Sequence, residues 1–197
     1  MTRCLTFACA LLLAFGAPAW ARDAPPPAPP SAATAPSPSE KLDELFACLA
    51  ASRDADESAG IVAAIDRIHL RSGSDTGDLL MARAVATMES GNYPVALALL
   101  DAIVGLQPEW AEGWNKRATA RYFVGDAKGA MADIAKTLER DPRHLGALAG
   151  MGMILEDSGL RAEALRVYER ALAIAPQWRP MNEAVARVKA ALAGQAL

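Results

Sequence analysis

The side chains that most often carry catalysis or bind metals are few in this sequence of 197 residues, and they are far apart. It has two histidines, His69 and His144, and neither lies at metal-ligand spacing from another His, a Cys or a carboxylate. No Gly-rich phosphate loop, Gly-x-Ser-x-Gly elbow or zinc-binding helix motif occurs. We therefore expect no catalytic residue, no bound metal and no cofactor, with both histidines at the surface or at a helix cap. A carboxylate pair assembled by the fold, which would suit a small hydrolase, stays open.

The cysteines are also unsuited to chemistry within one chain. Cys4 and Cys9 fall in an N-terminal segment that reads as a targeting signal, so Cys48 is the one that remains after it. A single cysteine cannot form an internal disulfide. Because Cys48 stands in the apolar string 45–49, we expect a small buried core residue. An intermolecular disulfide in an oxidising compartment is the alternative.

Composition favours helices and argues against nucleic-acid binding. Hydrophobic residues make up 52% of the chain, and most of them are the 44 Ala and 23 Leu. Both are good helix formers, whereas strands favour β-branched residues, so an all-α fold is expected. The net charge of −3 offers no strong positive field to hold a phosphate backbone.

The N-terminal segment has the features of an export signal. Residues 1–21 combine Arg3, an apolar run over 5–15 and the small-x-small ending Ala19-Trp20-Ala21. The run is too short to span a bilayer, which takes about 20 helical residues. We predict a cleaved signal peptide, no integral membrane segment after cleavage and a bacterial periplasmic location. A buried N-terminal helix and a lipoprotein signal ending at Cys9 are the alternatives.

Residues 22–39 are dominated by Pro, Ala and Ser. Such a segment cannot bury enough surface to fold, so we predict a disordered linker that acts as a spacer. A docking peptide for a Pro-binding module is the alternative.

Similar residues then recur every 34 positions along the chain. A period of this length indicates stacked helix pairs. Small residues would let two helices approach closely, Gly would end the first helix of a pair in a left-handed conformation, and Pro would follow the second helix. The rows are Ala84, Ala118 and Gly152; Gly91, Gly125 and Gly159; Ala96, Ala130 and Ala164; and Pro108, Pro142 and Pro176.

These rows resemble the tetratricopeptide repeat motif, which runs Trp-x2-Leu-Gly-x2-Tyr, then Ala-x3-Phe, then Pro. Trp114 takes the first motif position of the second repeat, whereas Arg83, Thr87, Arg117 and Arg121 depart from the pattern. The resemblance implies an all-α, right-handed superhelical α-solenoid of antiparallel helix pairs. Its three repeats would span 77–110, 111–144 and 145–178.

The flanking segments have helical spacing without the full motif. Residues 40–76 are predicted to form an N-terminal helical hairpin, a degenerate repeat that caps the array. Residues 179–197 are predicted to form a C-terminal capping helix and tail, with charged residues that solvate the last repeat.

A concave groove is the predicted functional site, because the first helices of stacked pairs line such a surface. Its apolar end and acidic edge favour an extended peptide or amphipathic helix with apolar anchors and some basic charge. Burial of the first-repeat positions under the N-terminal hairpin is the alternative. The predicted groove residues are Met81, Val85, Met88, Asn115, Thr119, Tyr122, Phe123, Ala149, Met153 and Glu156, with Asp78, Glu89, Glu112 and Asp157 joining Glu156 at the edge.

The resemblance implies a non-enzymatic protein–protein interaction module, here an exported adaptor. Some members of the family hold C-terminal carboxylates with a Lys and Asn clamp in the groove. In this sequence the groove positions include Asn115 but no cation, although Lys116 is adjacent, so chaperone-tail ligands are not expected. A self-associating scaffold of the cell envelope is the alternative function.

Overall fold

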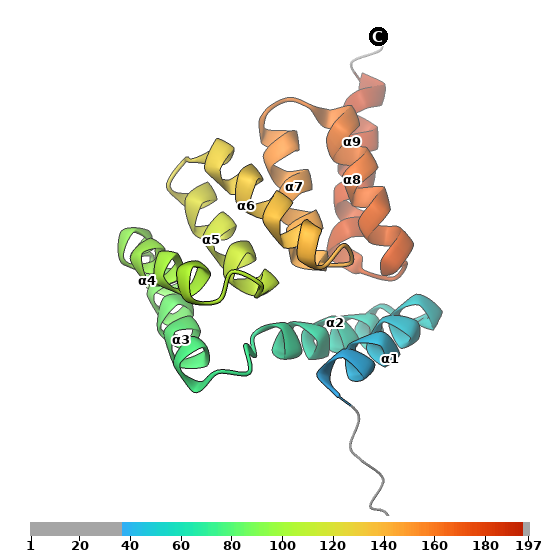
Figure 1. The fold of residues 1–197 in the computed structure, drawn as a ribbon. Helices are drawn as coiled ribbons and strands as arrows, with labels where there is room; N and C mark the ends of the chain where they lie inside the picture. Colours follow the sequence, from blue (N-terminus) through green and yellow to red (C-terminus); the bar gives the residue numbers. More distant parts are fainter. Residues whose placement is uncertain (1–36, 195–197) are drawn as a thin grey trace, which may run out of the picture. The chain divides into compact units, whose positions relative to one another are not determined.

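The computed structural model describes residues 37–194, and these residues are helical with no strand (Figure 1). The all-α prediction is therefore confirmed. The helices are α1 (Pro38–Ala51), α2 (Ala55–His69), α3 (Asp75–Glu89), α4 (Tyr93–Leu106), α5 (Ala111–Phe123), α6 (Ala127–Arg140), α7 (Leu145–Asp157), α8 (Arg161–Ile174) and α9 (Arg179–Gly194).

Helices α3 to α8 form three consecutive antiparallel pairs, as the repeat spacing predicts (Figure 1). Each pair turns at a glycine with positive φ: 76° at Gly91, 83° at Gly125 and 78° at Gly159. L-residues with a side chain rarely adopt this conformation, which explains why Gly recurs at the same position of each repeat. Pro108, Pro142 and Pro176 fall in the turns between pairs, after the second helix has ended.

Small residues sit where the two helices of a pair cross. Ala96, Ala130 and Ala164 are fully buried. In the third pair a Cβ on Gly152 would lie 2.1 Å from the Tyr168 ring, so this position tolerates no side chain beside the bulky Tyr. The smaller Leu100 and Ile134 take the position of Tyr168 in the other two pairs, where Ala84 and Ala118 replace Gly152.

The departures from the repeat motif in the second pair form a buried ion cluster. Arg117 binds both carboxylate oxygens of Asp133 at 2.8 Å, and Arg121 Nη1 lies 2.9 Å from Asp133 Oδ2. Asp133 is 2% exposed and carries two cationic partners. Trp114 lies on the outer side of this cluster, half-buried, with the Arg117 guanidinium 4.8 Å from its ring centroid.

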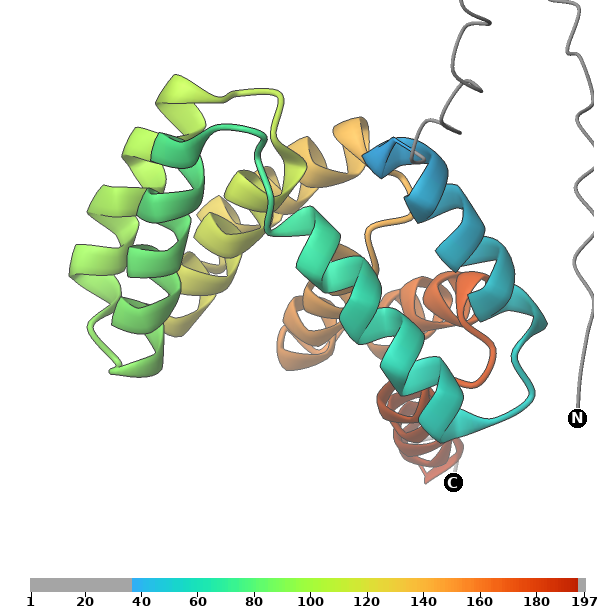
Figure 2. The ribbon, with the colours of Figure 1, turned by 90° about the horizontal axis from the view of Figure 1, so that it is seen from below.

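The α1–α2 hairpin does not occupy the place of a capping repeat stacked on α3. Phe46, Leu49 and Ile65 instead pack on Leu145 at the start of α7 and on Ala175 in the turn before α9, among other residues. The hairpin thus lies against the turns that follow the second helices of the repeats (Figure 2).

Ion pairs over long sequence distances hold the hairpin in this position. Arg143 Nη2 is 2.6 Å from Asp43 Oδ1, and Arg179 Nη2 is 3.0 Å from Asp56 Oδ1. The hairpin does not stack on α3 as expected, because its apolar side chains are buried against these turns instead.

Helix α9 covers the last repeat, as predicted. Met181, Ala184 and Val188 are buried against Tyr168 and Ala171 of α8, among other residues. Arg187 and Lys189 of α9 pair with Glu156 of α7 and Glu169 of α8.

Two details of the N-terminal region differ from the sequence predictions. Cys48 is exposed rather than buried, because it lies on the outer side of α1. Helix α1 begins at Pro38, within the predicted linker, since Ser37 forms a capping box with Glu40. The predicted signal peptide and most of the linker lie outside the described residues. Among residues 37–194, every helix is too short or too polar to cross a bilayer.

Candidate functional site

Part of the predicted groove forms a pocket of about 170 Å³ between α5 and α7, floored by α6. The structure brings six of the predicted residues together here, from the first helices of two successive repeats. The pocket has no charged side chain in its lining, which consists of Asn115, Ala118, Thr119, Tyr122, Phe123, Ile134, Gly146, Ala149, Gly150, Met153 and Ile154. We call it the groove pocket.

Aromatic side chains at the end of α5 form part of the rim of the groove pocket. Phe123 is 56% exposed and stacks on Tyr93, with ring centroids 4.9 Å apart. The Tyr122 hydroxyl donates to Asp157 Oδ2 at 2.5 Å, and this hydrogen bond raises the pKa of Tyr122. Met153 is 43% exposed on the facing helix. An exposed aromatic ring beside a flexible thioether is a surface suited to an apolar side chain.

The polar groups at the base of the groove pocket are already hydrogen-bonded inside the protein. Asn115 donates to Glu112 Oε2 at 2.9 Å and is buried. The Thr119 hydroxyl donates to the Asn115 carbonyl at 3.0 Å. The base of the pocket therefore offers little unused polarity to a ligand.

The other predicted groove residues lie elsewhere. Met81 is 1% exposed and belongs to the core between α3, α4 and α5. Val85 and Met88 are half-buried and pack on the same core, together with Leu70 and Trp110, among others. Leu70, directly after α2, is the residue of segment 40–76 that packs on this core. The alternative of burial under the N-terminal hairpin therefore holds for this one contact.

The predicted acidic edge is also smaller than expected. Glu156 turns towards α9, where Arg187 holds both of its carboxylate oxygens at 3.0 Å and Tyr168 donates a hydrogen bond. Glu112 is buried at the start of α5. Asp157 remains exposed and accepts the Tyr122 hydroxyl at the rim, and Glu89 is exposed at the end of α3.

Glu112 is the centre of a buried polar network that sequence analysis did not find. His144 Nε2 donates to Glu112 Oε2 at 2.8 Å, and Lys116 Nζ lies 3.1 Å from Oε1. Burial raises the pKa of Glu112, but the hydrogen bond from His144 and the charge of Lys116 outweigh it and lower the pKa to about 2. Glu112 is therefore an ionised, fully partnered carboxylate in the interior.

The two histidines meet in this network. Their rings stack with centroids 4.6 Å apart and planes at 15°. His69 Nε2 lies 3.2 Å from Asp141 Oδ2, and the pKa of Asp141 is lowered because this contact and its neighbours outweigh the effect of burial. His144 caps α7 through its Nδ1, which accepts from the Ala147 amide at 3.2 Å. The prediction of a cap role is right for His144, but the residue is buried rather than at the surface.

Comparison with known proteins decides the family. No family model matches the sequence. A TPR repeat-containing protein of Rhizobium etli is 40% identical over 158 residues, which cover 80% of this chain and 78% of that protein. The chain belongs to the tetratricopeptide repeat family. Tetratricopeptide repeat protein 36 of Danio rerio is 29% identical over 119 residues, covering 58% of this chain and 64% of that protein.

Solved tetratricopeptide repeat structures share this fold. The Sgt2 TPR domain from Aspergillus fumigatus matches with a TM-score of 0.59 and 19% identity, over 62% of this chain and 83% of that one. The first TPR of Spaghetti (RPAP3), bound to the HSP90 peptide SRMEEVD, matches with a TM-score of 0.58 and 19% identity, over 61% and 98%. At this identity the likeness supports the solenoid fold alone.

The geometry of this tetratricopeptide repeat protein argues against a metal at the histidine pair. One ligand atom each from His69, Glu112 and His144 lies within 4.8 Å of the others. However, the lone pairs of stacked rings lie in nearly parallel planes and cannot converge on one ion. His144 also uses Nδ1 for the α7 cap and Nε2 for Glu112. The cluster is better described as a hydrogen-bond network that ties α2 to the repeats.

One signal in the sequence could have located part of this network. Trp110 and His144 are 34 residues apart, so they are equivalent positions, and each is the N-cap of a first helix. Both contact the same residue: the Trp110 indole donates to the His69 carbonyl at 2.8 Å, and His144 stacks on the His69 ring. The docking of α2 that brings His69 there has no counterpart in the repeat pattern.

Proposed function

We propose that this chain is a protein-interaction module whose groove pocket receives an apolar side chain from an extended segment or helix of a partner. The observation that carries the proposal is an uncharged pocket between α5 and α7 with Phe123 and Met153 exposed at its rim. Burying an apolar side chain there would contribute roughly 1.5–3 kcal/mol, enough to make it an anchor.

The peptide expected here differs from that of the structural neighbour in complex with SRMEEVD, whose ligand ends in acidic residues. No cation lines the groove pocket, and the amide of Asn115 and the ammonium of Lys116 both bind Glu112. The exposed Asp157 beside Tyr122 favours a ligand with a basic residue next to its apolar anchor.

A peptide-selection experiment tests this proposal. Peptides selected on the purified repeat protein from a random display library are measured by fluorescence anisotropy against Phe123→Asp, Met153→Asp and the control Val95→Asp. Val95 is a matched control because it is 48% exposed but lies on α4, outside the pocket. We expect an apolar residue common to the selected peptides and at least about tenfold weaker binding to the two groove variants.

Either of two results would contradict the proposal. One is that no selected peptide depends on Phe123 or Met153. The other is that Val95→Asp weakens binding as much as the groove variants do.

We further propose that the module is an exported adaptor. Residues 1–21 have the composition of a cleavable signal, and the Pro-rich stretch that follows would hold the repeats away from the membrane or from neighbouring proteins. Expression in a bacterial host, followed by fractionation and N-terminal sequencing, should find the periplasmic chain starting at Arg22. Recovery of the chain in the cytoplasm with residues 1–21 intact would refute export.

A further inference from the structure

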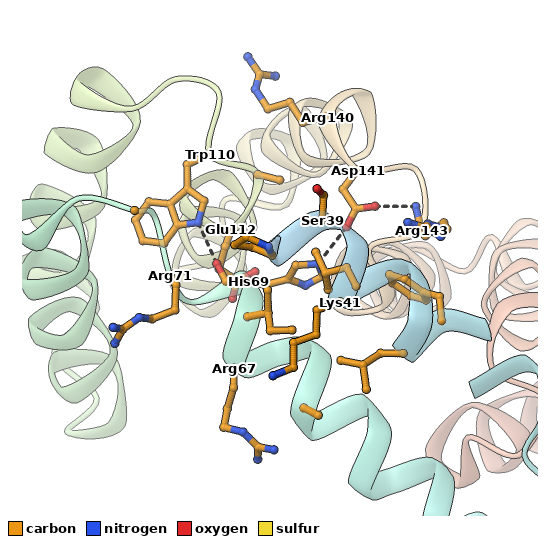
Figure 3. Close-up of a pocket in the computed structure, with 18 residues that line it drawn as sticks. Ser39, Lys41, Arg67, His69, Arg71, Trp110, Glu112, Arg140, Asp141 and Arg143 are labelled. Atoms are coloured by element: carbon orange, nitrogen blue, oxygen red, sulfur yellow. Dashed lines mark hydrogen bonds and ion pairs between the residues drawn. The ribbon is translucent and has the colours of Figure 1, made fainter. Parts of the chain in front are cut away.

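A second and larger pocket lies between the α1–α2 hairpin and the turns that join the repeats (Figure 3). Its volume is about 820 Å³, and its floor is apolar, formed by Leu42, Leu45, Phe46, Ile68 and Trp110. We call it the hairpin pocket. It is separate from the groove pocket, since no residue lines both.

The hairpin pocket is cationic although the chain as a whole carries a net charge of −3. Its lining contains two carboxylates, Glu112 and Asp141, against five cations: Lys41, Arg67, Arg71, Arg140 and Arg143. Glu112 is ion-paired with Lys116, and Asp141 accepts the Arg143 amide at 3.0 Å and contacts His69. Both carboxylates are therefore engaged. Arg71, Arg140 and Arg143 are also ion-paired, with acids outside the lining, so Lys41 and Arg67 are the lining cations without an ion pair among residues 37–194.

Several of these cations are available to a ligand. Lys41 and Arg67 are exposed and form no ion pair within residues 37–194. Arg71 contacts Asp78 at 3.3 Å with its side chain 76% exposed. Exposed charges of one sign without partners raise the local concentration of ligands of the other sign.

Two further features at the pocket wall are compatible with the same ligand charge. Trp110, the N-cap of α5, makes no side-chain hydrogen bond to the first-turn amides, so the positive end of this helix is uncapped at the pocket wall. His69 Nε2 is buried beside the pocket, and its nearest charged atom is Asp141 Oδ2 at 3.2 Å.

We propose that the hairpin pocket binds an acidic segment of a partner protein, with one or two apolar side chains on the floor and carboxylates on the rim. Figure 3 shows the cations spread around the pocket and pointing apart, with Arg140, Arg143, Arg67 and Arg71 on different sides. A ligand with one head group would meet only one of them, whereas a peptide with alternating acidic and apolar residues meets several. The Pro-rich segment 22–36 of this chain holds a single acid, Asp23, and does not fit this description.

The test uses the unlabelled peptide Asp-Leu-Glu-Phe-Asp-Leu-Glu, with capped ends, as the probe. Its control replaces Asp by Asn and Glu by Gln and keeps the apolar residues. Titration calorimetry gives the affinity, and the indole N–H resonance of Trp110, assigned with Trp110→Phe, reports whether the peptide occupies this pocket. We expect a Kd below about 100 µM for the acidic peptide, a shift of the Trp110 resonance, and at least about tenfold weaker binding of the uncharged control.

Charge-reversed variants locate the binding. Lys41→Glu with Arg67→Glu should weaken binding of the acidic peptide at least about tenfold. Both residues are exposed on helices, and an acid in the first turn of α1 suits the helix dipole, so the variant should fold. The matched control is Lys128→Glu with Arg166→Glu, which reverses two exposed charges away from the pocket and should leave the affinity unchanged.

Several outcomes would overturn the proposal. They are no binding below 1 mM, equal binding of the uncharged peptide, equal loss in the control variant, or no shift at Trp110. If dodecanoate bound more tightly than the peptide and displaced it, the occupant would be an amphiphile instead. If the wild type dimerised in light scattering and the charge-reversed variant did not, the occupant would be a second copy. None of these results bears on Phe123 or Met153, so this proposal and the proposed function can fail separately.

Discussion

The groove pocket and the hairpin pocket are built from the same repeats but differ in size, charge and origin. The groove pocket is small and uncharged, and its walls are neighbouring helices of the array. The hairpin pocket is larger and cationic, and one of its walls comes from residues 38–73, which precede the repeats. Stacking alone thus produces an apolar groove, whereas a cationic site at the edge of the array requires an added element.

A hydrogen bond between Asn115 and Glu112 links the two pockets. Glu112 lines the hairpin pocket, and its carboxylate holds Asn115, which lines the groove pocket. The network around Glu112 therefore supports both sites, for which we propose ligands of opposite charge.

The largest expected effect comes from removing this shared support. Glu112→Gln should lower the free energy of unfolding at pH 7 by about 3 kcal/mol, because the ionised carboxylate with its pKa of about 2 is lost. The pKa of Glu112 is lowered in the folded state, so its stabilisation is present above about pH 4.5 and is lost as the pH falls towards 2. Urea denaturation of both proteins at pH 7 and pH 2.5 should show the difference shrinking at the lower pH.

The matched control for this prediction is Glu109→Gln. Glu109 also pairs with a cation, Arg140, but its side chain is 86% exposed, so the change should cost no more than about 0.5 kcal/mol. Equal effects of the two substitutions would mean that the buried network does not stabilise the fold.

A substitution where α7 and α8 cross should affect ligand binding at the two pockets differently. Gly152→Ala places a Cβ against the Tyr168 ring and should destabilise the fold by about 2 kcal/mol. Helix α7 carries Met153 and Ala149, so groove ligands should bind more weakly, whereas the acidic peptide should bind as before. Adding Tyr168→Leu, which reproduces the residue pairing of the first repeat, should recover most of the stability measured by thermal unfolding. No recovery would place the cause outside this crossing.

Salt should distinguish the two binding modes. Raising NaCl from 50 to 500 mM should weaken binding of the acidic peptide about tenfold, because salt screens the attraction between its carboxylates and the rim cations. The affinity of a groove ligand anchored by an apolar side chain should change less than about twofold. Calorimetric titrations at the two salt concentrations give both values. If the affinity of the acidic peptide did not depend on salt, the proposed difference in charge between the two pockets would be wrong.

The smallest effect is expected at Cys48. It is exposed on α1 and lines neither pocket. A thiol reagent should therefore label it in the folded protein, and both peptide affinities should stay unchanged within error. Protection of Cys48 from the reagent until urea is added would show that this face of α1 is covered in solution.

The sequence predicted what depends on short-range pattern. The row of positions that includes Thr119, Tyr122 and Met153 lines the groove because stacked first helices present the same face. Positive-φ turns at Gly91, Gly125 and Gly159 follow for the same reason. The first repeat differs at Met81, which is buried in the core between α3, α4 and α5 instead of lining the groove.

Long-range docking was the part that pattern could not supply. His69 and His144 meet across 75 positions of sequence, through the packing of Phe46 and Ile65 on Leu145 and Ala175. Each of these apolar residues has helical spacing within its own segment, but the spacing does not say which surface they cover. The histidine pair, the Glu112 network and the hairpin pocket all depend on that choice.

The position of the hairpin also has a consequence for how the chain folds. An open repeat array is held by nearest-neighbour interfaces, so its ends can fray while the middle persists. Here Asp56 near the start of the described chain pairs with Arg179 near its end, and Phe46 shares a core with Ala175. Closing these contacts spans more than 120 residues, which raises the entropic barrier to folding and slows it. In return, the last repeat cannot come apart without releasing the first helices, and the whole unit should melt in one cooperative step.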